Sequence, residues 1–100
     1  MKNVQHVGGA FSVLETEGGV QTAAMRLERG IQSGPLGNEH ADSVQVLFVA
    51  EGAVQAQIGT RRFRMEAGDS VIVAKGAAHR FVGDSDEPAI TFNIYVPPAY

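Results

Sequence analysis

The sequence contains no cysteine, and this absence excludes disulfides and thiolate metal ligands. It also contains no apolar run close to the ~20 residues that a membrane-spanning helix requires. No N-terminal stretch has the pattern of a secretory signal. We therefore expect a cytoplasmic protein with no membrane partner.

Charge is also scarce, because charged residues make up 19% of the chain and the net charge is −3. A slightly acidic chain has no bulk electrostatic attraction for nucleic acid. Apolar residues make up 44% of the sequence, which is enough for one core, so we expect residues 1–100 to form a single domain. A domain of this size buries only about 60–65% of the surface of its unfolded chain. We therefore expect a two-fold homodimer, which would bury more.

Helical periodicity is missing, since no segment of ten or more residues repeats its apolar positions at a 3.6-residue spacing between caps. Residues 47–49, 71–73 and 90–96 are instead rich in β-branched and aromatic side chains. Apolar and polar residues alternate in 54–58, and the turn signal Gly59-Thr60 follows. Seven to nine short strands of this kind predict an all-β sandwich or small barrel without a long helix.

Two histidines are candidates for an open metal site. His79 follows a turn and opens a predicted strand, and His40 lies upstream with Gln45 five residues beyond it. Imidazoles from different strands, together with polar side chains that carry lone pairs, are typical ligands of such sites. Each of these residues has an ordinary structural alternative, in packing or in hydrogen bonding to backbone. Without cysteine, and without a serine in a hydrolase motif, hydrolysis by a catalytic triad is disfavoured.

The region around His79 carries a family resemblance. The cupins are small jelly-roll β-barrels with two short sequence motifs. The spacing of their second motif is found here in Gly68, Ala74, Gly76, His79 and Gly83. That motif places glycine, proline, glycine, histidine and asparagine at these positions. Both glycines and the histidine match, whereas alanine replaces the proline and glycine replaces the asparagine.

The region around His40 resembles the first cupin motif. Asn38, His40, Gln45 and Gly52 stand where that motif has histidine, histidine, glutamate and glycine. Together the two motifs span residues 38–83. The chain therefore resembles the small single-domain cupins of the cupin 2 conserved barrel type, many of which have no assigned activity. This resemblance implies a cupin-type double-stranded β-helix, that is, a jelly-roll barrel.

The resemblance implies Asn38, His40, Gln45 and His79 as the ligands of a divalent metal, with Fe, Zn, Ni or Mn as candidates. On a regular strand, residues 38 and 40 point the same way and Glu39 points the other way. A bulge could turn Glu39 inward as an anionic ligand instead. Without Glu39 the ligand set carries no negative charge, and we then expect the metal to be bound weakly or to be absent.

Strand parity adds expected pocket residues. Leu47 shares a face with Gln45, Phe81 shares one with His79, and Asn93 and Tyr95 share a face of the last strand. Core packing is the alternative role for Leu47 and Phe81.

The resemblance implies a pocket for a small polar molecule. It also implies a divalent-metal-dependent oxidoreductase of dioxygenase type, or an isomerase. Two alternatives stay open: a non-catalytic small-ligand-binding module, and a structural or regulatory cupin with a degenerate metal site.

Overall fold

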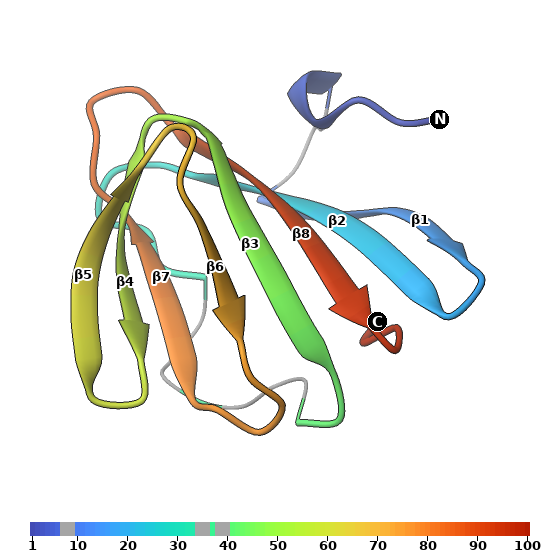
Figure 1. Cartoon of the computed structure of the whole chain (residues 1–100). Coiled ribbons are helices and arrows are strands. Elements are labelled where there is room, and N and C mark those ends of the chain that lie inside the picture. The colour runs from blue at the N-terminus through green and yellow to red at the C-terminus, as the bar shows by residue number, and fades with distance from the viewer. Residues whose placement is uncertain (7–9, 34–36, 38–40) are drawn as a thin grey trace.

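The computed structural model of the chain describes residues 1–6, 10–33, 37 and 41–100. Within these residues, the chain forms one short 3-10 helix, η1 (Val4–His6), and eight strands (Figure 1). The strands are β1 (Phe11–Glu17), β2 (Val20–Leu27), β3 (Val44–Glu51), β4 (Ala53–Ile58), β5 (Arg61–Glu66), β6 (Ser70–Val73), β7 (His79–Gly83) and β8 (Ala89–Val96). This confirms the prediction of an all-β chain without a long helix. In the described part of the chain, no helix has the length and apolar character needed to cross a bilayer.

The strands form two antiparallel sheets. The larger sheet has the order β1-β2-β8-β3-β6 and the smaller has the order β5-β4-β7. Strands distant in sequence are neighbours in the larger sheet, since β8 lies between β2 and β3. Figure 1 shows the smaller sheet closing against the β3–β6 side of the larger one. The arrangement agrees with the jelly-roll barrel expected from the sequence.

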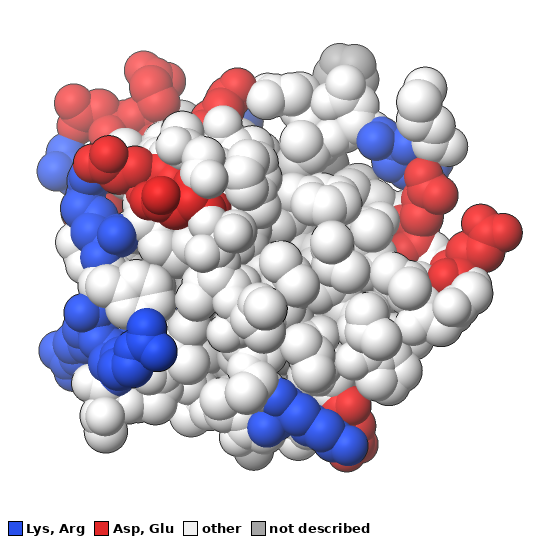
Figure 2. Space-filling model, viewed as in Figure 1, with Lys and Arg blue, Asp and Glu red and all other residues white. Residues whose placement is uncertain are grey.

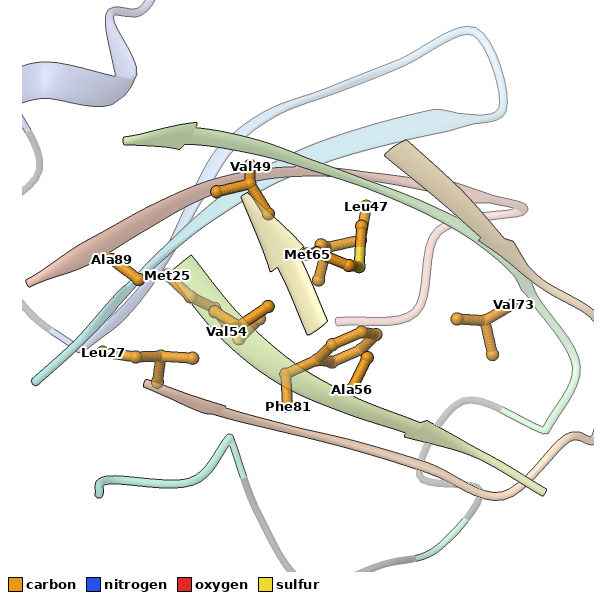
Figure 3. Packing of buried hydrophobic residues seen from close by; sticks show 10 residues of the cluster. All are labelled: Met25, Leu27, Leu47, Val49, Val54, Ala56, Met65, Val73, Phe81 and Ala89. Atoms are coloured by element: carbon orange, nitrogen blue, oxygen red, sulfur yellow. The ribbon is translucent and has the colours of Figure 1, made fainter. Parts of the chain in front are cut away.

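The core lies between the two sheets. Figure 3 shows Leu47 and Val49 of β3 on one side, with Val54, Ala56 and Phe81 of β4 and β7 opposite them. Complete burial of such a side chain contributes about 1.5–3 kcal/mol, before the opposing loss of chain entropy. The buried cluster consists of Met25, Leu27, Leu47, Val49, Val54, Ala56, Met65, Val73, Phe81 and Ala89. Leu47 and Phe81, named above as pocket candidates, are thus members of the packed core.

The outer edge of β7 is covered by the segment that follows β2. Gly30 N donates to Gly83 O at 2.9 Å, and Gly83 N donates to Ile31 O at 3.0 Å. A Cβ atom on Gly83 would lie 2.3 Å from the carbonyl oxygen of Glu28, so the close approach admits only glycine. This approach explains why glycine stands where the cupin motif has asparagine. Covering the edge also removes a template for aggregation.

Candidate functional site

His79 is held at the start of β7 by its own turn. It is 9% exposed and shares the inner face of the strand with Phe81, with 6.1 Å between the ring centroids. Its Nδ1 lies 2.9 Å from the carbonyl oxygen of Ala77. A carbonyl only accepts hydrogen bonds, so Nδ1 carries a proton, and Nε2 is the ring nitrogen that would face a bound metal. Metal-binding histidines are commonly oriented by a backbone carbonyl in this way.

The backbone of His79 also fixes the chain that leads to the other predicted ligands. His79 N donates to Gly37 O at 2.8 Å, and the two residues form an isolated antiparallel bridge. Asn38, Glu39 and His40 follow Gly37 in the sequence and lie outside the described residues. Their predicted roles as ligands therefore stay predictions.

Gln45 lies on the inner face of β3, as expected. It pairs with Tyr95 of β8 and Val73 of β6, and its side chain is only 2% exposed. Its Oε1 is buried and has no hydrogen-bond partner among the described residues. Leaving a buried amide oxygen unpaired costs about 1–3 kcal/mol. Gln45 thus presents an unused acceptor inside the protein.

A row of polar side chains runs along the inner face of β8. Thr91, Asn93 and Tyr95 are at most 1% exposed. Thr91 Oγ1 donates to Asn93 Oδ1 at 3.2 Å, and Asn93 Nδ2 donates to the Tyr95 hydroxyl oxygen at 3.5 Å. Parity placed Asn93 and Tyr95 on one face, and the structure places both inside. Thr91 belongs to the same row, and the sequence reasoning missed it although the same two-residue spacing identifies it.

Gln21 of β2 is a second buried glutamine beside Tyr95, and the sequence analysis did not single it out. Its Nε2 donates to Tyr100 O at 2.8 Å, and its Oε1 accepts from the backbone N–H groups of Ala99 and Tyr100. Gln21 therefore anchors the C-terminal residues. Its oxygen is satisfied, whereas no described residue pairs with that of Gln45, so of these two glutamines Gln45 is the one that offers an acceptor to a ligand.

Among the described residues, the site contains no carboxylate. Gln45 and His79 come from facing sheets, and β3 and β7 both begin at the lower end of the barrel in Figure 1. Among the residues with described placement, no group of three or more His, Cys, Asp or Glu side chains is positioned to hold a metal. Two donors, an amide oxygen and an imidazole nitrogen, are what these residues contribute.

Comparison with known proteins places the chain in a family. Residues 24–95 match the sequence pattern of the cupin domain. A protein of Bacillus halodurans has the same fold with a TM-score of 0.86 at 21% identity, over 97% of this chain and 76% of that one. No curated protein shows significant similarity to the sequence.

Two further solved structures show the same likeness. A cupin 2 conserved barrel domain protein from Salinispora arenicola has a TM-score of 0.74 at 18% identity, over 86% of this chain and 73% of that one. A sugar phosphate isomerase from a cupin superfamily, from Silicibacter pomeroyi, has a TM-score of 0.74 at 24% identity, over 89% of this chain and 60% of that one. At these identities the likeness establishes a shared fold.

Proposed function

The chain belongs to the cupin family, and on this premise we propose that its barrel binds a small polar molecule beside Gln45, His79 and the polar row of β8. The observation that carries the proposal is the buried Oε1 of Gln45, which has no hydrogen-bond partner within the described part of the chain. A ligand that donates an O–H or N–H group to this oxygen would remove the penalty of its burial. Asn93 and Tyr95, on the adjacent strand, would orient the rest of the ligand.

We further propose that a divalent metal shares this pocket. Cupins often bind divalent metals. His79 and Gln45 would supply two donors to such an ion, because the Ala77 carbonyl orients the His79 ring and Gln45 Oε1 accepts no hydrogen bond from any residue that the structure describes. His40 and Asn38 would complete the set, and Gly37, which is bridged to His79, directly precedes them in sequence.

A bound ion would act as a Lewis acid on an oxygen of the ligand. The Ala77 carbonyl would keep the His79 ring oriented toward the ion, and the amide of Asn93, which donates to the Tyr95 hydroxyl, would help to position the ligand. The proposed activity is that of an oxidoreductase of dioxygenase type or an isomerase. The sugar phosphate isomerase neighbour is compatible with the isomerase class.

A second function, ligand binding without turnover, is favoured by the lack of a carboxylate among the described site residues. Gln45 replaces the glutamate of the first cupin motif, so the described donors hold a cation without help from a negative charge. Inward placement of Glu39 would restore that charge and favour the metal-dependent enzyme. The two functions differ in whether metal binds at stoichiometric level.

The test is elemental analysis of protein purified without a histidine tag, after reconstitution with Fe(II), Zn(II), Ni(II) or Mn(II). We expect the wild type to retain one of these metals and both His79→Ala and His40→Ala to lose it. His6→Ala is the matched control, because His6 lies in η1, outside the barrel strands, and it should keep the metal. A wild type that retains none of the four contradicts the metal-dependent function and leaves ligand binding without turnover.

A further inference from the structure

The outward face of the larger sheet carries apolar side chains in consecutive cross-strand rows. Val44 lies opposite Val96, and the next two rows continue across β2, β8, β3 and β6. These rows consist of Thr22, Ile94, Val46 and Ile72, and of Ala24, Phe92, Phe48 and Ser70. Ala24 is buried within the chain itself. We call the remaining nine residues the apolar face: Val44, Val96, Thr22, Ile94, Val46, Ile72, Phe92, Phe48 and Ser70. None is charged, and Figure 2 shows uncharged atoms over β3, β6 and β8 with both signs of charge around the margin.

The smaller sheet shows what a solvent-facing surface of this protein looks like. Its outward row consists of Arg62, Gln57 and Arg80, which lie side by side on β5, β4 and β7. An antiparallel sheet with one face in water normally alternates in this way, apolar inside and polar outside. The apolar face departs from that rule on the same molecule.

The alternation is inverted along β8. The inward residues Thr91, Asn93 and Tyr95 are polar, and the outward residues Phe92 and Ile94 are apolar. The inward polar row belongs to the candidate pocket. The two outward residues are half-buried and lie in rows with large apolar side chains that face water, with Ile72 of β6 67% and Phe48 of β3 38% exposed. A partner that covers the outward row would explain why β8 keeps this pattern.

We propose that the apolar face packs on the same face of a second copy of this chain, in a two-fold dimer. A face without charge meets no repulsion from its own copy, and it offers a charged partner nothing to pair with. Two twisted sheets stack well face to face, about 10 Å apart with their strands about 30° from parallel. A two-fold axis that lies in the plane between the two sheets places the face opposite its own copy, as an isologous interface requires.

The size of the face suits this partner. Nine residues, each at ~4.8 Å spacing between strands and ~6.6 Å spacing along a strand, give a footprint on the order of 300 Å² in projection. Contiguous apolar patches of this size on soluble chains are often functional. A standard interface covers about 800 Å² of accessible surface on each partner. The protruding side chains raise the area above its projection, and the charged margin supplies the polar rim such interfaces have.

Sedimentation equilibrium of the full chain, with Ile72→Lys and Val44→Lys, tests the proposal. We expect a wild-type dimer in the micromolar range and a dissociation constant raised by at least about 30-fold in each variant, because an interface cannot pair the buried ammonium. Val13→Lys is the matched control: Val13 is 44% exposed, close to the 38% of Val44, but it pairs with Ala23, whose side chain faces inward. This control should dimerise like the wild type.

A wild type that stays monomeric throughout the micromolar range overturns the proposal. So does a dimer that both lysine variants leave intact while circular dichroism reports a native fold. Hydrogen exchange of the wild type tests the same interface without any variant, so it applies even if the lysine variants do not fold. Amides of the edge strand β6 should exchange more slowly at dimeric than at monomeric concentration, and those of β5 should not change; equal rates in β6 contradict the proposed interface.

Discussion

Replacing Gly83 by alanine should destabilise the fold without altering any candidate ligand. A Cβ atom at this position would lie 2.3 Å from Glu28 O and 2.6 Å from Leu27 O. Both are backbone atoms, so no side-chain rotation relieves the clash. The φ of Gly83 is not among the positive ones, so the effect is steric and not conformational. Either β7 or the segment that covers its edge must move.

The magnitude follows from what that movement disturbs. Overpacking a closely packed site costs about 1–3 kcal/mol. Moving the segment away weakens the hydrogen bonds from Gly30 N to Gly83 O and from Gly83 N to Ile31 O, each contributing about 0.5–1.5 kcal/mol. Alanine restricts the unfolded chain, which offsets about 0.4–1 kcal/mol. We expect a net loss of about 2–4 kcal/mol, which lowers the Tm by roughly 10–25 °C in a domain of this size.

Urea and thermal unfolding followed by circular dichroism measure this loss. Gly59→Ala is the control, because a Cβ there meets nothing within 4 Å although its φ is 60°. It should lose only about 1 kcal/mol, from the left-handed backbone alone. Gly83→Asn, which restores the residue of the cupin motif, should be at least as unstable as Gly83→Ala. A Gly83→Ala protein that is as stable as the wild type, or more stable than the control, would refute the reasoning.

Three further predictions concern buried and surface polar groups. Thr91→Val removes the donor to Asn93 Oδ1 and should lower the free energy of unfolding by about 1–2 kcal/mol in urea titrations; an unchanged value would show that the bond contributes nothing. Gln45→Glu should strengthen Zn(II) or Mn(II) binding by at least about tenfold in calorimetry while destabilising the metal-free protein, since it places an anion in the pocket; equal affinity would exclude position 45 as a ligand. The Gln55 amide, as the largest of several causes, holds the pKa of Asp84 below its usual value of 3.8, so Asp84 contributes stability above that pH and loses it as the pH falls through its folded pKa. Stability curves of the wild type and Asp84→Asn should therefore converge only in acid, and a constant difference down to the lowest pH would contradict this.

Strand parity was predictable from the sequence because it depends only on local alternation. It placed Asn93 and Tyr95 together on the inner face of β8, and Gln45 with Leu47 on that of β3. Thr91 follows from the same spacing. The motif spacing around His79 likewise predicted the strand that His79 opens.

Features that depend on distant pairing were not predictable. The need for glycine at position 83 arises from a segment that lies more than fifty residues away in sequence. Gln21 and Gln45 look alike in the sequence, yet only Gln21 meets the C-terminal backbone, which leaves the oxygen of Gln45 unused.

The most direct test of the proposed site is long-range ¹H–¹⁵N NMR of the histidine rings during a Zn(II) titration. The account predicts that Nδ1 of His79 stays protonated toward Ala77 throughout, and that the ¹⁵N shift of Nε2 moves on saturation while the ring of His6 does not respond. A proton on Nε2 of the neutral ring, or an Nε2 shift that saturating Zn(II) leaves unchanged, would contradict it.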